Sequence, residues 1–439
     1  MALFVPVFLS LLVGCDYSGV QDSADQDSAA PTSRPNILLV IADDMGLDAS
    51  PCHSVGADPA TMPTIETLCE TGMVLDQAYA APLCSPTRAM LMTGRYGFRT
   101  GVGTVIERTE PGLSSDEYSL FDALEEGGYS TALVGKWHIS GQGDDDDHPA
   151  TLGVPEYFGL ISGSVASYYS WPAVHNGLSI QMDTYATTAL ADHAVSWLET
   201  QDGPWFLWLA FNAPHTPFHL PPAELHSQTD LTGSEEDISR NPQDYYRATL
   251  EALDSELGRV LDSLPEEQSA NTVVVFMGDN GTPGKVAADV YDARGAKGSI
   301  YEGGTHVPMV VAGPDVQVGR SDALVSAPDV YATVLELAGL PIPEVDGVSF
   351  LPALQGQAGD RGAVYIEHFG EEDDESANVM GWAIRDGRYK LVAPDGAEMQ
   401  LFDLAEDPYE AVDLLLGEPG DAELVKSLEL QALVTALKE

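Results

Sequence analysis

Basic residues are scarce in this chain. Only 19 Lys and Arg stand against 69 Asp and Glu among 439 residues, which leaves a formal net charge of −50. Binding to DNA or RNA depends on neutralising phosphates with Lys and Arg, so this charge excludes a nucleic-acid partner. The same shortage excludes attachment to a membrane surface through a basic segment. Because cations are so few, the position of each one is informative.

The N-terminal apolar run, residues 2–14, is too short to span a bilayer, which takes about 20 residues. It is typical of a secretory signal peptide, and residues 12–15 (LVGC) resemble a bacterial lipobox, although no Lys or Arg precedes the run. We therefore expect a signal sequence at 1–15 and a flexible polar tether at 16–33. The expected location is the periplasm or cell surface of a bacterium. A lipid anchor at Cys15 would be the sole membrane contact, and simple cleavage of the signal is the alternative.

Cysteine is also rare, with four residues in the chain. Cys15 falls in the lipobox, and Cys84 falls in a separate motif at 84–95. Cys52 and Cys69 are left, and in an oxidising compartment they could form a disulfide. The alternative is two separate buried thiols.

Apolar residues make up 44% of the chain, enough for a large core. Continuous apolar runs, of the kind buried on both faces of a parallel sheet, occur at 36–42, 131–134, 205–211, 272–277 and 307–312. Helical patterns between them, at 184–199 and 245–264 for example, predict an α/β fold with a large, mostly parallel central sheet flanked by helices. This catalytic domain is expected to span 34–355.

The pattern of apolar and turn residues changes near residue 356. Short strand patterns at 364–368, 381–384 and 389–392 are separated by turn residues. They predict a smaller C-terminal subdomain at 356–439, with an antiparallel sheet and a terminal helix.

Polar side chains follow four of the predicted strands of the main sheet. Because ligands bind beyond the carboxyl ends of parallel strands, these side chains are expected to gather at one edge. Three carboxylates and an amide among them are oxygen ligands suited to Ca²⁺ or Mg²⁺ rather than zinc. The residues concerned are Asp43, Asp44, Lys136, His138, Asn212, His215, Asp279 and Asn280.

The segment 84–95 (CSPTRAMLMTGR) carries a further motif. Pro86 fits the first turn of a helix and Gly94 fits its end. Cys84 would then lie at the helix N-terminus with Arg88 one turn away, where an anion is favoured. Taken alone, this pattern indicates either a cysteine nucleophile of lowered pKa or a small buried side chain.

Together these motifs resemble the sulfatase family, of the formylglycine-dependent arylsulfatase type in the alkaline phosphatase-like superfamily. Cys-x-Pro-x-Arg resembles its activation signature, and the resemblance runs from residue 34 to the end of the chain. The other landmarks follow in family order: 34–36, 43–46, 135–138, 212–215, 278–281, 297–304, 326–330, 346–349 and 388–391.

The resemblance implies a sulfuric ester hydrolase with an alkaline phosphatase-like sandwich fold. It implies that a maturation enzyme oxidises Cys84 to Cα-formylglycine, an aldehyde that hydrates to a geminal diol. One hydroxyl attacks sulfur to give a covalent sulfated intermediate, and deprotonation of the second allows sulfate to be eliminated.

Residue roles follow from the same resemblance. One Ca²⁺ would be held by Asp43, Asp44, Asp279, Asn280 and the modified Cys84. The remaining site residues would position these groups (Arg88, Lys136), accept the second hydroxyl's proton (His138), or bind sulfate and assist the leaving oxygen (His215, Lys297). Calcium and the three cationic side chains bring five positive charges against three carboxylates, which suits a monoanionic sulfate ester.

Two alternatives stay open: a phosphonate monoester or phosphodiester hydrolase of the same superfamily, and a non-catalytic calcium-binding lipoprotein. The acidic surface would repel a long sulfated polyanion, so a small aryl sulfate or a short sulfated saccharide is expected as substrate. A loop at 153–176 could select it through its aromatic residues, unless these pack in the core. They are Tyr157, Phe158, Tyr168, Tyr169 and Trp171. The acidic stretch 141–148 is expected to be a solvated loop.

Overall fold

The fold is described from a computed structural model, which places residues 1–2, 34–56, 58–107, 109, 111–142, 146–294, 296–370 and 379–439. The chain divides into two units, Met1–Ser33 and Arg34–Glu439, and the described strands and helices all belong to the second. The predicted signal sequence, lipid anchor and tether fall on 3–33, outside the described residues, and stay predictions. Among the described residues, no helix combines the length and apolarity needed to cross a membrane.

Ten of the described strands form one mixed sheet in the order β10-β2-β9-β8-β1-β7-β3-β4-β5-β6. The pairs β8-β1, β1-β7, β7-β3, β3-β4 and β10-β2 are parallel, whereas β9, β5 and β6 pair antiparallel with their neighbours. This confirms the predicted large, mostly parallel sheet. The strands are β1 Asn36–Ala42, β2 Met73–Tyr79, β3 Ser130–Lys136, β4 Tyr157–Leu160, β5 Trp171–His175, β6 Leu178–Met182, β7 Trp205–Phe211, β8 Thr272–Gly278, β9 Met309–Ala312 and β10 Gly319–Ser326.

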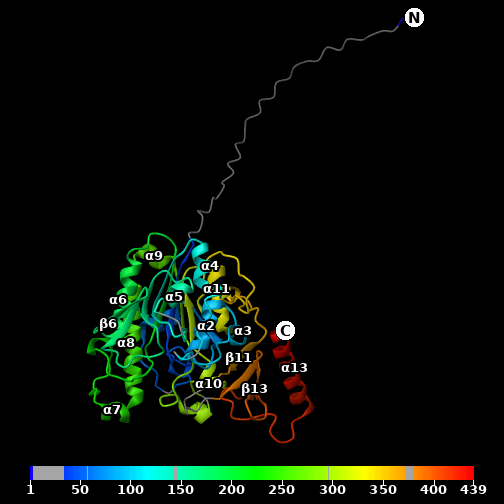
Figure 1. Ribbon diagram of the computed structural model, residues 1–439. Coiled ribbons are helices and arrows are strands. Elements are labelled where there is room, and N and C mark those ends of the chain that lie inside the picture. Colours follow the sequence, from blue (N-terminus) through cyan, green and yellow to red (C-terminus); the bar gives the residue numbers. More distant parts are fainter. Residues whose placement is uncertain are drawn as a thin grey trace, which may run out of the picture. The chain divides into compact units, whose positions relative to one another are not determined.

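Helices cover both faces of this sheet (Figure 1). The α-helices are α1 Pro63–Thr71, α2 Cys84–Thr93, α3 Gly97–Thr100, α4 Leu120–Glu126, α5 His148–Thr151, α6 Ala186–Leu198, α7 Glu235–Arg240, α8 Pro242–Asp262, α9 Glu266–Ala270, α10 Glu302–Thr305, α11 Ala327–Leu337, α12 Leu351–Leu354 and α13 Asp421–Lys438. Short 3₁₀ turns are η1 Leu47–Ala49, η2 Ala223–Leu225 and η3 Asp289–Arg294.

Strand β1 shows why the central runs are apolar throughout. Its odd-numbered residues, such as Leu39, pack in one core with α2, α4 and α11. Its even-numbered residues, such as Val40, pack in a second core with α1, α6 and α8. Because every side chain of β1 is buried, the strand has no polar face, and this is the pattern expected of a doubly covered parallel sheet.

A second, antiparallel sheet of four strands lies in the C-terminal part, in the order β11-β12-β13-β14. It confirms the predicted small antiparallel sheet and adds a fourth strand that the sequence patterns did not indicate. Helix α13 follows it and contacts β12 and β13. The strands are β11 Val364–His368, β12 Gly381–Arg385, β13 Tyr389–Pro394 and β14 Gln400–Asp403.

The C-terminal part holds the segment 298–302 of the main body in place. The Lys390 ammonium, fully buried on β13, lies 2.9 Å from Glu302 Oε1 and 3.0 Å from Glu410 Oε1. The backbone N–H of Glu302 donates to Glu410 Oε2 at 2.6 Å, and the Val379 N–H donates to the Gly298 carbonyl at 3.1 Å. The segment that begins just after Lys297 is therefore fixed from the C-terminal side.

Two expectations for surface loops are corrected. The segment 153–176 contains strands β4 and β5, and four of its five aromatics are at most 6% exposed because they pack between the sheet and its helices. Tyr169, at 43% exposure, is the exception. At the end of the acidic stretch, His148 is buried and accepts a hydrogen bond from Trp137 Nε1 at 3.0 Å, so this residue is not part of a solvated loop.

Cys52 and Cys69 form a disulfide, with their Cα atoms 6.2 Å apart. It connects the loop after η1 to α1. With a sequence separation of 17 between the cysteines, loop closure predicts that replacing both by Ala lowers the free energy of unfolding by about 3 kcal/mol. Urea denaturation of both proteins, with and without reductant, measures this loss. Reductant should destabilise the wild type and leave the double variant unchanged; equal sensitivity would contradict the assignment.

Candidate active site

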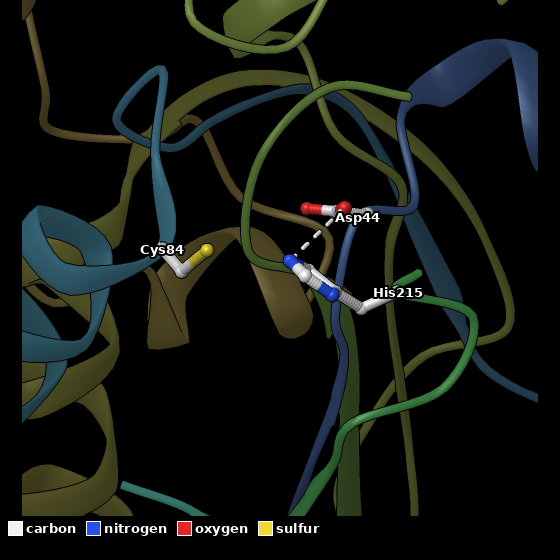
Figure 2. Close-up of side chains that lie close together, drawn as sticks. All are labelled: Asp44, Cys84 and His215. Carbon is white, nitrogen blue, oxygen red and sulfur yellow. Dashed lines mark ion pairs between the residues drawn. The ribbon is translucent and has the colours of Figure 1, made fainter. Parts of the chain in front are cut away.

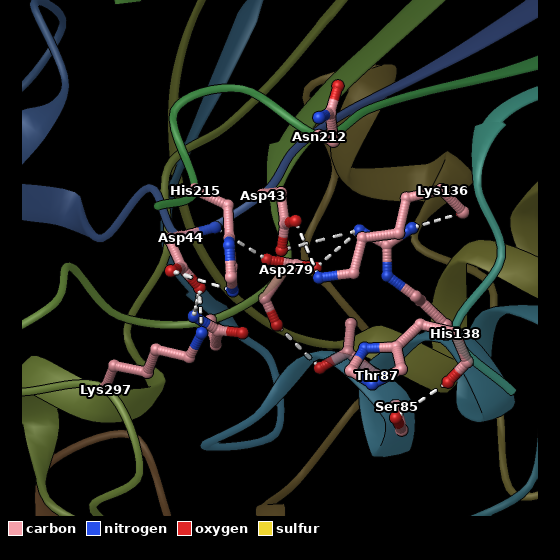
Figure 3. Close-up of polar contacts among 12 residues, drawn as sticks. Asp43, Asp44, Ser85, Thr87, Lys136, His138, Asn212, His215, Asp279 and Lys297 are labelled. Atoms are coloured by element: carbon pink, nitrogen blue, oxygen red, sulfur yellow. Dashed lines mark hydrogen bonds and ion pairs between the residues drawn. The ribbon is translucent and has the colours of Figure 1, made fainter. Parts of the chain in front are cut away.

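Strands β8, β1, β7 and β3 are consecutive neighbours in the sheet, and their carboxyl ends deliver most of the predicted site residues to one edge. Asp43 and Asp44 follow β1, and Asp279 and Asn280 follow β8. Lys136 ends β3, with His138 two residues beyond, and Asn212 and His215 follow β7. Figure 3 shows the side chains of Asp43, Lys136 and Asp279 close together, with Asp44 and His215 beside them, whereas the Asn212 side chain points away from this group.

Helix α2 brings Cys84 to the same place. The helix begins at Cys84 and ends at Gly94, whose φ of 68° is the left-handed conformation that glycine adopts readily. Both ends agree with the prediction from the motif. Cys84 is 1% exposed, and its Sγ comes within 4.8 Å of ligand atoms of two groups, Asp44 with His215 and Asp43 with Asp279. Figure 2 shows Cys84 facing Asp44 and His215.

Two buried cations hold the carboxylates of the site. Arg88 Nη2 donates to Asp279 Oδ2 at 2.7 Å and lies 3.7 Å from Asp43 Oδ1. Lys136 Nζ lies 2.6 Å from Asp43 Oδ2. Arg88 also donates to the backbone carbonyl of Lys136 at 2.7 Å, which ties α2 to the end of β3. The side chains of all four residues are at most 1% exposed, so these ion pairs are shielded from solvent.

Asp44 faces the more open side of the site. Its backbone has a φ of 71°, unusual for a residue other than glycine, and its N–H donates to Asp279 Oδ1 at 3.0 Å. Lys297 Nζ lies 2.6 Å from Asp44 Oδ1, and His215 Nε2 lies 3.7 Å from Asp44 Oδ2. The side chains of Lys297 and His215 are 19% and 15% exposed. They are therefore the most exposed of the predicted site residues.

Burial controls the protonation of the site. It raises the pKa of the Cys84 thiol to about 11, despite the nearby ammonium groups of Lys136 and Lys297. Of the two readings of the motif taken alone, the buried side chain therefore agrees with the structure and the cysteine of lowered pKa does not, because desolvation outweighs the helix N-terminus. Burial also lowers the pKa of His215 to about 3 and that of His138 well below its usual value, with neighbouring cations adding to the effect on His138. Both imidazoles are neutral near pH 7.

Three carboxylates lie close together here. Burial and the neighbouring Asp43 carboxylate raise the pKa of Asp279 to about 6, against the opposing effect of Arg88. Burial alone would also raise the pKa of Asp44, but Lys297 and His215 hold it well below its usual value. The raised pKa of Asp279 reflects burial and also repulsion between these carboxylates, and a bound cation would reduce that repulsion.

The donor set fits a calcium ion. Asp43 Oδ1 and Asn280 Oδ1 are buried oxygens that accept no hydrogen bond from the residues described. The Asn280 amide nitrogen donates to Asp44 Oδ1 at 2.9 Å, which fixes the orientation of its unpaired oxygen. Buried oxygens without donors are costly unless a cation satisfies them. With three carboxylates and one amide, the ligands are those that Ca²⁺ prefers.

Four residues support the site in a way that was not predicted from sequence, although Tyr168 had been named as a candidate for substrate selection. Ser85 Oγ donates to the His138 carbonyl and Thr87 Oγ1 to the Asp279 carbonyl, each at 2.7 Å. Tyr246 on α8 donates to the Asp44 carbonyl at 2.8 Å, and Tyr168 donates to the His215 carbonyl at 2.7 Å. Ser85 and Thr87 lie inside the Cys84 motif, so their position in the sequence could have indicated a role at the site. The two tyrosines lie far from any motif.

The amino-acid sequence of this chain is similar to those of known proteins. The family model described as Sulfatase matches residues 35–340, and that described as N-sulphoglucosamine sulphohydrolase, C-terminal, matches residues 290–438. The uncharacterized sulfatase YdeN of Escherichia coli (strain K12) is 29% identical over 377 residues, which cover 73% of this chain and 66% of that protein. Arylsulfatase G of Rattus norvegicus is 29% identical over 495 residues, covering 94% of this chain and 90% of that protein.

A solved structure agrees with these matches. The crystal structure of Ps i-CgsB in complex with k-i-k-neocarrahexaose has a TM-score of 0.78 and 27% identity, covering 92% of this chain and 93% of that one. Both the ten-stranded and the four-stranded sheet lie within the region that the family models match.

Proposed function

Since the chain belongs to the sulfatase family and is a sulfuric ester hydrolase, we propose that it removes sulfate from a small sulfated saccharide at a formylglycine made from Cys84. The observation that carries this proposal is the position of Cys84. It lies at the start of α2, within 4.8 Å of ligand atoms of Asp43, Asp44, His215 and Asp279.

Modification of Cys84 explains an otherwise unsuitable nucleophile. With its pKa raised to about 11, the thiol holds its proton at neutral pH, so the unmodified side chain is a poor nucleophile. The formylglycine hydrate supplies a geminal diol, of which one hydroxyl attacks sulfur and the other permits elimination of sulfate.

Asp43, Asp44, Asp279 and Asn280 are proposed to hold one Ca²⁺, as the unpaired oxygens of Asp43 and Asn280 suggest. The ion would supply Lewis acidity to a sulfate oxygen and to the attacking hydroxyl. Lys136 and Arg88 fix the orientation of Asp43 and Asp279 through their short, buried ion pairs.

The neutral histidines and Lys297 are proposed to accept the proton and to bind the sulfate group. His138 Nδ1 is buried and has no hydrogen-bond partner among the residues described, and His138 is proposed to accept the proton of the second hydroxyl at position 84. Lys297 and His215 are partly exposed beside Asp44. Lys297 is placed to contact sulfate oxygens and to stabilise negative charge on the leaving oxygen, and His215 would do so when Nε2 is protonated, because its Nδ1–H is bonded to the Thr216 carbonyl.

Two comparisons with known proteins support a saccharide substrate. The C-terminal region resembles a family described as N-sulphoglucosamine sulphohydrolase, C-terminal, and Ps i-CgsB was solved with a neocarrahexaose. The net charge of −50 disfavours long polyanions and favours a short saccharide or a terminal residue.

Rates on 4-nitrophenyl sulfate and on a phenylphosphonate monoester test the choice of sulfate. The protein is produced with a formylglycine-forming enzyme, and mass spectrometry confirms conversion of Cys84. We expect kcat/KM for the sulfate to exceed that for the phosphonate by at least about 10-fold. The reverse order would favour the phosphonate hydrolase. A panel of sulfated mono- and disaccharides, scored by sulfate release, then tests the saccharide assignment.

A further inference from the structure

A second cluster of metal-ligating side chains lies apart from the catalytic residues, at the β6 edge of the large sheet. Glu156 precedes β4, His175 is the last residue of β5, and His193 lies on α6. One ligand atom from each lies within 4.8 Å of the others. The hydrolysis of a sulfate ester makes no use of these three residues.

The three ligand atoms have the spacing of a metal site. Glu156 Oε1 lies 2.8 Å from His193 Nε2 and 3.1 Å from His175 Nε2. Zinc bound at about 2.0–2.1 Å in a tetrahedral site separates its ligands by about 3.3 Å. Both Glu156–histidine distances are within about 0.5 Å of that spacing, and the two histidine nitrogens lie within 4.8 Å of each other.

Neighbouring groups fix the orientation of the ligands. The Asn176 amide nitrogen donates to Glu156 Oε2 at 2.9 Å, and its oxygen accepts from the Tyr157 N–H at 2.8 Å. Phe158 stacks on the His193 ring with centroids 4.3 Å apart and meets the His175 ring edge to face at 6.1 Å. Contacts that need no metal therefore hold Glu156 Oε2 and both imidazole rings in place. The ligands of metal sites are commonly held by such supporting contacts.

We propose that Glu156, His175 and His193 form a zinc site with a water molecule as fourth ligand. Two imidazoles and one carboxylate suit a borderline metal such as Zn²⁺ rather than Ca²⁺. The Glu156, His175 and His193 side chains are 23%, 40% and 21% exposed, which gives an ion and a water access.

The site would act as a cross-link at the edge of the sheet. Strands β5 and β6 pair with each other beyond β4, and β6 is the terminal strand with mostly exposed residues. A metal bound to Glu156, His175 and His193 fastens this hairpin to α6. Since zinc binds the folded state, it should raise the melting temperature.

Zinc binding by the full-length protein tests the proposal. Chelator-treated protein is saturated with Ca²⁺ and then titrated with Zn²⁺ by calorimetry, and with Co²⁺ by visible absorption. The wild type is compared with His193→Gln and Glu156→Gln, and with His226→Gln as a control histidine outside the three clusters found among the described residues. Zinc bound at the catalytic residues contributes equally to all four proteins.

We expect the wild type and the control to bind one more equivalent of zinc than either cluster variant, or to bind it at least about 10-fold more tightly. The Co²⁺ absorption and the zinc-induced rise in melting temperature should be lost in both variants, while aryl sulfate hydrolysis is unchanged. Circular dichroism identifies a variant that fails to fold, and the other then decides the result. Equal zinc stoichiometry, affinity and thermal shift in all four proteins would overturn the proposal.

Discussion

Replacement of Cys84 by serine is expected to give a protein that releases about one equivalent of alcohol and then stops. The serine hydroxyl occupies the same position at the start of α2, near Asp43 and Asp279, and can attack sulfur once. It provides one hydroxyl on the β carbon, whereas the hydrated aldehyde provides two. Without the second hydroxyl, elimination of sulfate is impossible, and the serine sulfate ester persists.

The measurement pairs a burst assay with an activated aryl sulfate and intact-protein mass spectrometry. The burst should equal the enzyme concentration, and the protein should gain the mass of one SO₃ group at position 84. Cys84→Ala is the matched control, since it has no hydroxyl and should show neither burst nor adduct. Sustained multiple turnover by Cys84→Ser would refute the requirement for a diol.

Removal of calcium is expected to lower kcat/KM by at least about 1,000-fold, with recovery when Ca²⁺ is returned. Without the ion, Arg88, Lys136 and Lys297 face three carboxylates, so the site has no net positive charge to attract a sulfate ester. Asp44→Asn should reproduce the loss and weaken calcium binding. Its main partner, Lys297, is partly exposed, so the unpaired ammonium stays hydrated and the fold is retained.

Asp254→Asn is the control for this experiment. Asp254 is another buried aspartate, and it accepts hydrogen bonds from the N–H groups of Thr64 and Ile65 at the start of α1. Its replacement should leave calcium affinity unchanged. Asp279→Asn is less informative, because it removes the 2.7 Å partner of the fully buried Arg88. Breaking such a pair typically costs about 3–5 kcal/mol of stability. Full activity after exhaustive chelation would contradict the calcium assignment.

The sequence predicted the core strands well because their burial on both faces leaves an unbroken apolar run, as in β1 and β7. It also predicted the clustering of Asp43, Asp279 and Lys136, since parallel strands place their carboxyl ends together. The segment containing β5 was mistaken for a loop. Pro172 interrupts its strand pattern, and such a proline is tolerated only near the edge of a sheet.

Contacts between distant segments could not be predicted. Tyr168 and Tyr246 each donate one hydrogen bond to a backbone carbonyl of the site, and nothing in their local sequence distinguishes them from ordinary core tyrosines. Likewise, the raised pKa of Cys84 depends on how completely the fold buries it. The motif alone gives the position at a helix start and not the degree of desolvation.

The contacts between Lys390, Glu302 and Glu410 make the segment beside the site dependent on the end of the chain. A nascent chain that has just emerged beyond α11 already contains Cys84 and all four proposed calcium ligands. In that chain Glu302 would be buried without the Lys390 ammonium 2.9 Å away, and Gly298 without the Val379 N–H. The Lys297 N–H would keep its bond to the Thr282 carbonyl at 3.0 Å. A chain cut short before β13 would therefore retain every proposed calcium ligand, but it would lack the ammonium that neutralises Glu302 beside the site.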